Sequence, residues 1–300
     1  MERRTGQSGS SSPGRVAVVT DSTAYLAPDL AAEFGVHVVP LHVVIDGVPR
    51  VEGAGIGPQE VAAALRGHAK VSTSRPTPQA LLDTYRQVAE QGADHIVSVH
   101  LSGGLSGTVD AARLAAEEAT VPVEVVDSES IGMGLGFAVL AAAAAARRGS
   151  SSHDVVAAAT ATTRRSSAFF YVDTLEYLRR GGRIGPASAM LGTALAIKPL
   201  LYLDGGLIKP LEKVRTAAKA VARLEDLAVE RAGTAEVNIA VHHLDNAARA
   251  EALASRLSGR LTAIDDLVVS EVGAVIGAHT GPGMLAVVVS PVGHRLPYPR

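Results

Sequence analysis

The chain has 300 residues, of which 47% are hydrophobic, 19% charged and 3% aromatic, so it is long and apolar enough to bury a sizeable core. Its formal net charge of -2 and its lack of tryptophan argue against nucleic acid as a partner, which would call for a basic or aromatic surface. Cysteine is absent, which excludes disulfides, a thiolate nucleophile and zinc–thiolate sites.

The first half of the chain alternates short apolar runs with segments of helical period. Residues 1–14 are polar, rich in serine and glycine and without the apolar run of a signal peptide, so they predict a flexible tail. The predicted strands are Val16–Thr20, Val36–Val44, His95–Leu101 and Val123–Val126. The predicted helices are Pro58–Arg66, Pro78–Gln91, Gly107–Ala119 and Gly132–Arg148. This alternation predicts an α/β domain over residues 15–160, with a doubly wound parallel sheet.

The second half, residues 161–292, predicts a mixed α+β domain, because hairpins stand beside helices. The expected elements are the helix Asp154–Arg165, the strand Ala168–Val172, the loop Arg179–Gly185, the helix Pro186–Ile197, the strands Leu200–Leu203 and Leu207–Pro210, a helix from Arg215, the strand Asn238–His243, the helix Ala247–Leu257, and the strands Leu267–Val275 and Met284–Ser290. The longest uncharged stretch, Ile131–Ala146, is shorter than the roughly 20 apolar residues that span a bilayer. It therefore predicts a core helix rather than a transmembrane segment, and a cytoplasmic protein.

Polar loops follow three of the predicted parallel strands, where ligands bind in a doubly wound fold. These loops are Thr20–Thr23, Leu101–Thr108 and Asp127–Ser130, and a fourth polar cluster, Ser72–Pro76, precedes the helix at Pro78. Each cluster is equally well explained by helix N-caps. Hydroxyls and amides near helix N-termini also favour an anion, and four such clusters on one rim predict an anion-binding site.

Three patterns of enzymatic sites are not fulfilled. The segment Gly104–Thr108 is similar to a nucleophile elbow, but a threonine stands where that turn needs a small residue, and the Gly-Lys-Ser/Thr ending of a P-loop is also missing. His242 and His243 are adjacent on a predicted strand, so they face opposite sides and do not share a metal ion. The sequence therefore predicts no metal site and no catalytic residue.

Two motifs of the second half carry concentrated polar chemistry. The loop Arg179–Gly185 places three guanidinium groups around glycines, which suits either a solvated loop or a site for an anion or a partner. The segment His279–Gly283 joins two predicted strands, and its imidazole either serves a ligand or is incidental to a turn.

Taken together, these motifs resemble those of the DegV family over Val16 to Val289. The motifs that carry the resemblance are Val19–Thr23, Val39–Leu41, Thr73–Pro78, Leu101–Thr108, Val126–Ser128, Tyr177–Ile184, Ile197–Leu200, Lys213–Arg215 and His279–Gly283. Their common order and spacing make the match specific. The chain departs from the family pattern at Val48–Glu52 and at Val109–Ala111, which concerns the outer wall of a pocket and hence chain-length preference.

The resemblance implies a two-domain protein that holds a long-chain fatty acid in the cleft between its domains and needs no cofactor. It further implies a FakB-like binding subunit, which presents the fatty-acid carboxylate to a separate fatty-acid kinase subunit for phosphorylation. The residues implied to contact the carboxylate are Thr73, Ser74, Ser106 and His279. Those implied to support the polar end or to dock the kinase are Asp21, Ser22, Gly107, Arg180 and Arg183.

Elementary energetics agree with a fatty-acid ligand. Burial contributes roughly 0.8 kcal/mol per methylene, or on the order of 10 kcal/mol for a sixteen-carbon chain before ordering costs. A buried carboxylate needs hydrogen bonds in place of water, and charge-assisted ones are the strongest. Two alternatives stay open: a phosphotransferase or acyl hydrolase that uses the same rim by itself, and a lipid carrier that has no kinase partner.

Overall fold

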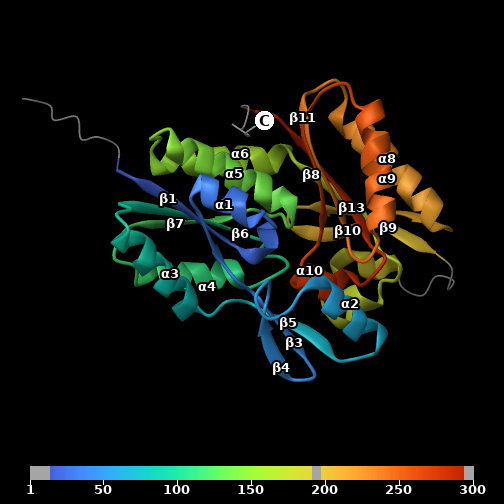
Figure 1. Ribbon diagram of the computed structural model, residues 1–300, viewed down its shortest axis with the longest axis horizontal. Helices are drawn as coiled ribbons and strands as arrows, with labels where there is room; N and C mark the ends of the chain where they lie inside the picture. Colours follow the sequence, from blue (N-terminus) through green and yellow to red (C-terminus); the bar gives the residue numbers. More distant parts are fainter. Residues whose placement is uncertain (1–13, 191–196, 294–300) are drawn as a thin grey trace, which may run out of the picture.

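The computed structural model describes residues 14–190 and 197–293, which form two α/β units lying side by side (Figure 1). The first unit is built on a parallel sheet with strand order β2-β1-β6-β7, and the second on a six-stranded mixed sheet. The predicted fold class, an α/β protein with two units, is confirmed. The predicted division at residue 160 lies inside the helix α6 (Ser152–Arg165) and stays a prediction.

Helices cover both faces of the parallel sheet, as expected for a doubly wound fold (Figure 1). Its strands are β1 (Val16–Asp21), β2 (Val36–Val39), β6 (His95–His100) and β7 (Val123–Asp127). One face packs against α3 (Pro78–Glu90) and α4 (Thr108–Glu117), and the other against α1 (Pro28–Phe34) and α5 (Met133–Arg147). The central strands β1 and β6 are nearly continuous runs of buried residues, because both of their faces are covered.

The helix α5 is the core helix that the uncharged stretch predicted. Almost every one of its residues is buried, because the sheet lies on one side and α6 on the other. Gly136 lets the helix approach the carbonyl oxygen of Ala24, where a Cβ atom would come within 2.7 Å. No helix within residues 14–190 and 197–293 combines the length and the apolar character that crossing a membrane takes.

A small antiparallel sheet with order β4-β3-β5 extends from the first unit. Its strands are β3 (His42–Ile45), β4 (Val48–Val51) and β5 (Val71–Ser74), and the helix α2 (Pro58–Arg66) connects β4 to β5. The prediction of one strand over Val36–Val44 is therefore wrong. Pro40 offers no amide to a sheet ladder, and the next amide, that of Leu41, donates to Ser22 Oγ at 3.0 Å instead of to a strand.

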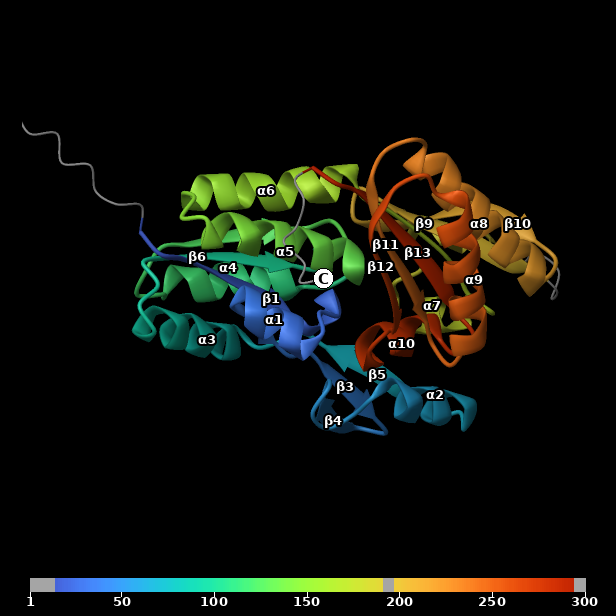
Figure 2. The same ribbon diagram turned by 45° about the horizontal axis from the view of Figure 1, so that its top comes forward.

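The second unit has the strand order β10-β9-β8-β13-β11-β12. The strands are β8 (Ser167–Tyr171), β9 (Lys198–Asp204), β10 (Leu207–Val214), β11 (Val237–His243), β12 (Ile264–Glu271) and β13 (Leu285–Pro291). The helices α8 (Ala217–Ala232) and α9 (Ala247–Arg260) pack on the outer face, and the inner face turns toward the first unit (Figure 2).

The segment around His279 differs from its prediction. The strand predicted over Leu267–Val275 ends at Glu271, and a short helix, α10 (Ala274–Thr280), follows. His279 therefore lies in the last turn of a helix rather than in a turn between two strands.

The basic loop is also partly helical, because Arg179 and Arg180 belong to α7 (Glu176–Arg180). The helix predicted over Pro186–Ile197 is a 3-10 helix at Gly185–Met190, and residues 191–196 lie outside the described residues. Lys198 is the first residue of the strand β9.

Candidate functional site

A cavity of about 370 Å³ lies between the two units. Its size falls within the range of roughly 300–1,000 Å³ that is typical of small-molecule sites. Its apolar wall consists of Leu41, Leu101, Leu105, Ile131, Ala168, Phe170, Leu178, Leu203, Ile208, Val272, Val275, Ile276, Met284, Ala286 and Val288. These side chains are aliphatic apart from one ring, so the cavity suits a flexible hydrocarbon chain.

The cavity has one polar end. Thr73, Ser74, Ser106, Arg183 and His279 all line it, so the structure brings together the four residues expected to contact a carboxylate and one expected to support them. They come from β5, from the loop after β6, from the segment after α7 and from α10, which are far apart in the sequence. Ser74 is exposed, so this end opens toward the surface.

His279 is the central group of the polar end. Its Nε2 lies 2.8 Å from Thr73 Oγ1, and its Nδ1 is a buried ring nitrogen without a hydrogen-bond partner among the described residues. Burial, together with the nearby Arg183 guanidinium, lowers the pKa of His279 to about 4. The imidazole is therefore neutral at neutral pH. A carboxylate entering beside it would raise that pKa and gain a charge-assisted hydrogen bond.

Arg183 is fixed in place by two backbone carbonyl groups. Its Nε donates to Leu105 O at 2.9 Å and its Nη1 to Gly181 O at 2.6 Å. A guanidinium has five N–H groups, so these bonds leave it able to serve an anion as well. Gly181 also packs directly against the His279 ring, and a Cβ atom there would collide with Nδ1. The glycine of the basic loop is needed for this close approach.

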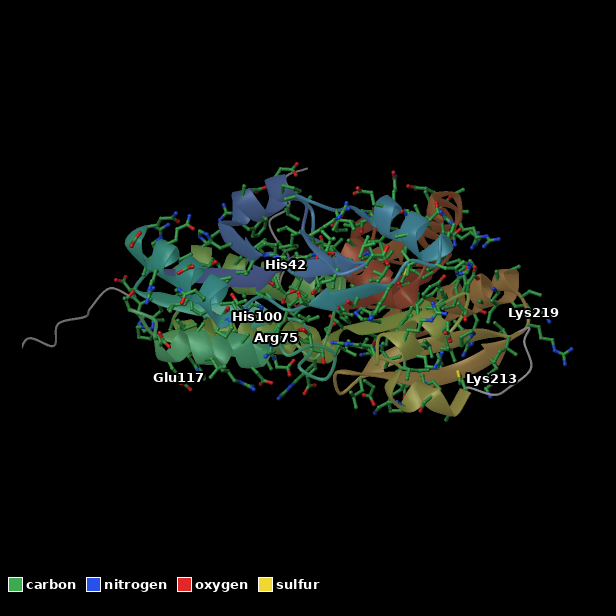
Figure 3. The ribbon with its side chains drawn as sticks, turned by 90° about the horizontal axis from the view of Figure 1, so that it is seen from below. His42, Arg75, His100, Glu117, Lys213 and Lys219 are labelled. Carbon is green, nitrogen blue, oxygen red and sulfur yellow. The ribbon has the colours of Figure 1, made fainter. Side chains whose placement is uncertain are left out.

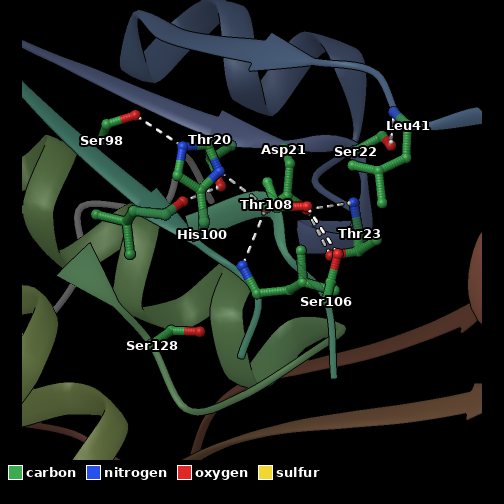
Figure 4. A network of polar contacts seen from close by, with 12 residues as sticks. Thr20, Asp21, Ser22, Thr23, Leu41, Ser98, His100, Ser106, Thr108 and Ser128 are labelled. Atoms are coloured by element: carbon green, nitrogen blue, oxygen red, sulfur yellow. Dashed lines mark hydrogen bonds and ion pairs between the residues drawn. The ribbon is translucent and has the colours of Figure 1, made fainter. Parts of the chain in front are cut away.

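The loop that carries Ser106 begins at a buried carboxylate (Figure 4). Asp21 Oδ2 accepts hydrogen bonds from the amide of Leu101 at 3.0 Å and from His100 Nδ1 at 3.0 Å. Asp21 Oδ1 accepts from Thr23 N at 3.1 Å and from Thr23 Oγ1 at 2.5 Å. Asp21 is fully buried and does not line the cavity. It therefore fixes where the loop begins and lies outside this cavity.

Ser98, His100 and Asp21 follow one another as in a catalytic triad. Ser98 Oγ lies 2.8 Å from His100 Nε2, but it also accepts a hydrogen bond from Tyr85 at 2.9 Å. All of these side chains are buried, and neither Ser98 nor His100 lines the cavity. Ser106, which does line it, pairs with Thr108 at 2.9 Å rather than with a histidine. Within residues 14–190 and 197–293, no hydrogen bond thus joins the serine of the polar end to a histidine.

The helix α10 is held from the first unit. Glu52 Oε1 accepts from the amide of Val275 at 2.7 Å, and Tyr25 OH accepts from the amide of Ile276 at 3.2 Å. Ser22 Oγ donates to Glu52 Oε2 at 2.5 Å. Burial raises the pKa of Glu52 above its usual value, although these hydrogen bonds counteract the shift. Ser22 therefore positions the helix that carries the cavity histidine, and it does not line the cavity.

The remaining expected residues divide between the cavity and the surface. Gly107 lines the cavity, and its carbonyl oxygen accepts from Arg75 Nη1 at 3.2 Å. Arg75 also belongs to the polar lining, although no separate role was predicted for it (Figure 3). Arg180 does not line the cavity and instead pairs on the surface with Glu176 at 2.7 Å. Within residues 14–190 and 197–293, no cluster of three or more possible metal ligands occurs.

His242 forms part of the cavity wall, which the sequence did not indicate. Its Nε2 accepts from the amide of Met133 at 3.0 Å, and its Nδ1 lies 2.9 Å from Ser270 Oγ. Burial lowers the pKa of His242 to about 4, so it stays neutral. Because both nitrogens are bonded, the ring presents little polarity to the cavity. Its neighbour Gly132 has a φ of 62°, which brings backbone close to the ring.

Comparisons with known proteins agree with this architecture. The profile of the DegV family, described as uncharacterised proteins, matches residues 15–292. A DegV domain-containing protein of Streptomyces coelicolor is 58% identical over 275 residues, which cover 92% of this chain and 98% of that protein. One from Mycobacterium tuberculosis is 40% identical over 91% of this chain and 96% of its own length.

Solved structures give the same result. A DegV family protein from Thermus thermophilus, described by its fatty acid binding, superposes with a TM-score of 0.88 at 36% identity, over 93% of this chain and 100% of its own. DegV of Bacillus subtilis, described as a fatty acid binding protein, superposes with a TM-score of 0.86 at 32% identity, over 93% and 99% of the two chains.

Proposed function

The chain belongs to the DegV family, and we propose that it binds one long-chain fatty acid in the cavity between its two units. The observation that carries this proposal is the cavity itself, which is aliphatic along its length and gathers its hydrogen-bonding groups at one end. A fatty acid has the same division between a hydrocarbon chain and a single polar group. The fatty-acid-binding relatives of known structure support the same assignment.

The carboxylate lies at the polar end in this proposal. Ser106, Thr73 and Ser74 offer hydroxyl donors, and Arg183 offers a fixed cation. His279 gains a proton as the anion arrives, because a negative charge favours the imidazolium form. These groups replace the water that a carboxylate loses on burial, and the charge-assisted bonds are the stronger part of that replacement.

The second part of the proposal concerns what happens to the bound acid. The chain is a binding subunit and not the catalyst, and a separate fatty-acid kinase phosphorylates the carboxylate while this chain holds it. The exposure of Ser74 and Arg75 supports this, because a kinase must reach the polar end from outside. Arg180, on the exposed face of α7 a few residues from Arg183, is a suitable contact for the kinase.

Mass spectrometry of an organic extract tests the binding function first. Protein purified without added lipid is expected to release about one fatty acid per chain, which also identifies the preferred acyl chain. The double variant Ser106→Ala/His279→Ala is the control and is expected to fold but release much less. A lipid-free wild-type extract, with no uptake of added fatty acids, would overturn the proposal.

A phosphorylation assay tests the role of the kinase. The loaded protein, ATP and a candidate bacterial fatty-acid kinase are expected to yield acyl phosphate only when all three are present. Acyl phosphate formed without the kinase would indicate a stand-alone phosphotransferase, and release of acid from an acyl ester would indicate a hydrolase. Full lipid binding without any product for every kinase offered would favour a carrier.

A further inference from the structure

A second cavity lies directly beyond the apolar end of the first. It has a volume of about 430 Å³ and is lined by the loop after β7, by α6, by the start of β8 and by the turn between β9 and β10. Ala168 and Leu203 line both cavities. These two side chains therefore form the partition between them.

The two cavities differ in their chemistry. The lining of the second consists largely of hydroxyl and charged side chains, among them Asp127, Glu129, Thr163, Ser167 and Asp204. The wall of the first cavity, by contrast, is aliphatic on the side of the partition, where Val288 and Ile208 lie. A ligand that crossed the partition would pass from a hydrocarbon environment into one that offers hydrogen bonds.

The partition lies at the end of the cavity that is remote from His279. Val288 pairs in register with Ala168 and comes four residues after Met284, which is near the polar end just past α10. Four residues of a strand span about 13 Å. The strand β8 itself crosses the partition, because Ser167 lines the polar cavity and Phe170 the apolar one. On β9, Leu203 lines both cavities and Asp204 only the polar one.

We infer that the protein accepts fatty acids with a hydroxyl at the end remote from the carboxylate, and that this hydroxyl enters the polar cavity past Ala168. The inference rests on the proposed function, since it assumes that the carboxylate occupies the end with His279. A closed apolar end would strip such a hydroxyl of its water and weaken binding by roughly tenfold or more. A polar cavity replaces those lost hydrogen bonds. On the β8 side of the partition, only the methyl group of Ala168 stands between the two cavities.

Binding to the delipidated full-length chain tests this inference, with hexadecanoic and 16-hydroxyhexadecanoic acid compared by calorimetry. The wild type is expected to bind the two acids within about threefold of each other. The variant Ala168→Leu is expected to lower the affinity for the hydroxy acid by about tenfold or more. Its affinity for dodecanoic acid, which is four carbons shorter, is expected to stay nearly unchanged. Ala161→Leu, an exposed position on α6, is the matched control and is expected to alter neither.

Each outcome decides the inference. If the wild type bound hexadecanoic acid tightly but the hydroxy acid about tenfold more weakly, the inference would be overturned and the proposed function would stand. Equal binding of the hydroxy acid to the wild type and to Ala168→Leu would also overturn it, because the chain end would not then lie at the partition. Failure of the wild type to bind any of the three acids would overturn the proposed function instead, and the inference with it.

Discussion

Two clusters of hydroxyl and imidazole groups lie close to each other in this molecule and have different roles. In the cluster around Asp21 and His100, both ring nitrogens of the histidine are bonded and each carboxylate oxygen accepts two hydrogen bonds. In the cluster around His279 and Ser106, one ring nitrogen has no partner among the described residues, and the groups line a cavity. The first cluster is saturated and sealed, which is what a scaffold requires. The unpaired His279 nitrogen packs against Gly181, so the second cluster keeps its bonding capacity for a ligand in the Arg183 guanidinium and the serine hydroxyls.

The strongest test of this contrast is the removal of the buried carboxylate. Asp21→Ala leaves Thr23, His100 and the amide of Leu101 without their acceptor in the interior. Each unsatisfied buried group costs roughly 1–3 kcal/mol, so we expect the free energy of unfolding to fall by about 4 kcal/mol. Urea unfolding followed by circular dichroism measures this. The control Glu33→Ala, at an exposed position of α1, is expected to change the stability by less than about 0.5 kcal/mol. A loss below about 1 kcal/mol for Asp21→Ala would remove the scaffold role.

The response to pH sharpens the comparison for the two cavity histidines. The pKa values of His242 and His279 are lowered to about 4 in the folded chain. The unfolded chain therefore binds more protons between about pH 6.5 and pH 4, so stability is full above that window and falls as the pH drops through it. For each histidine the loss between pH 7.5 and pH 5 amounts to about 2 kcal/mol.

Urea unfolding at both pH values, for the wild type and for His242→Gln and His279→Gln, isolates these contributions. Each variant is expected to show a smaller loss than the wild type. Glu52, whose pKa burial raises, acts in the opposite direction and is common to all three chains, so it cancels in the comparison. Added fatty acid is expected to reduce the acid sensitivity that depends on His279 but not that of His242, because only the former meets the carboxylate. Equal pH dependence in all three chains would contradict the assignment.

The scaffold cluster was harder to recognise from the sequence than the parallel sheet. Runs of β-branched residues are a local signal, and they located the four parallel strands, although Pro40 divides one run between two sheets. Whether Asp21 is a ligand contact or a buried acceptor depends on partners 79 and 80 positions later, His100 and Leu101, which no local pattern reveals. Family resemblance supplied the motif but not this distinction.

The helix α10 shows the same limit. Its sequence contains Val275 and Ile276 after a β-rich run, so it reads as the continuation of a strand. Gly273 and the acceptor Glu52, 223 positions before Val275, convert it into a helix. The position of His279 in the cavity therefore follows from a long-range contact. Arg75 and His242 also line the cavity through long-range contacts, because strands distant in the sequence come together there.

A smaller effect is expected from the cation of the polar end. Arg183→Met removes charge-assisted hydrogen bonds worth roughly 1.5–3 kcal/mol, so we expect fatty-acid affinity to fall by about ten- to a hundredfold. The affinity for hexadecanol, which has no carboxylate, is expected to fall far less. Arg183→Lys keeps the charge without the planar guanidinium, so its affinity for the fatty acid should lie between those of the wild type and of Arg183→Met. Arg86→Met, on the surface of α3, is the matched control. Equal losses for the acid and the alcohol would show that Arg183 only shapes the loop.

The last prediction compares the same substitution, serine to alanine, in the two clusters, where the expected effects are the smallest. Ser98→Ala leaves Tyr85 OH and His100 Nε2 unpaired in the interior, so we expect the free energy of unfolding to fall by about 2 kcal/mol. Ser106→Ala leaves one buried group, the Thr108 hydroxyl, without its partner among the described residues, so we expect the smaller fall of about 1 kcal/mol.

Fatty-acid affinity should show the reverse order. Ser106→Ala deletes a hydrogen-bond donor to the carboxylate and is expected to weaken binding about fivefold, whereas a folded Ser98→Ala binds nearly as well as the wild type. Calorimetric titration of both variants with hexadecanoic acid measures this. Saturation of hydrogen bonds, rather than the type of residue, would then separate scaffold from site. If Ser98→Ala weakened binding more than Ser106→Ala without loss of stability, the two clusters would have to exchange roles.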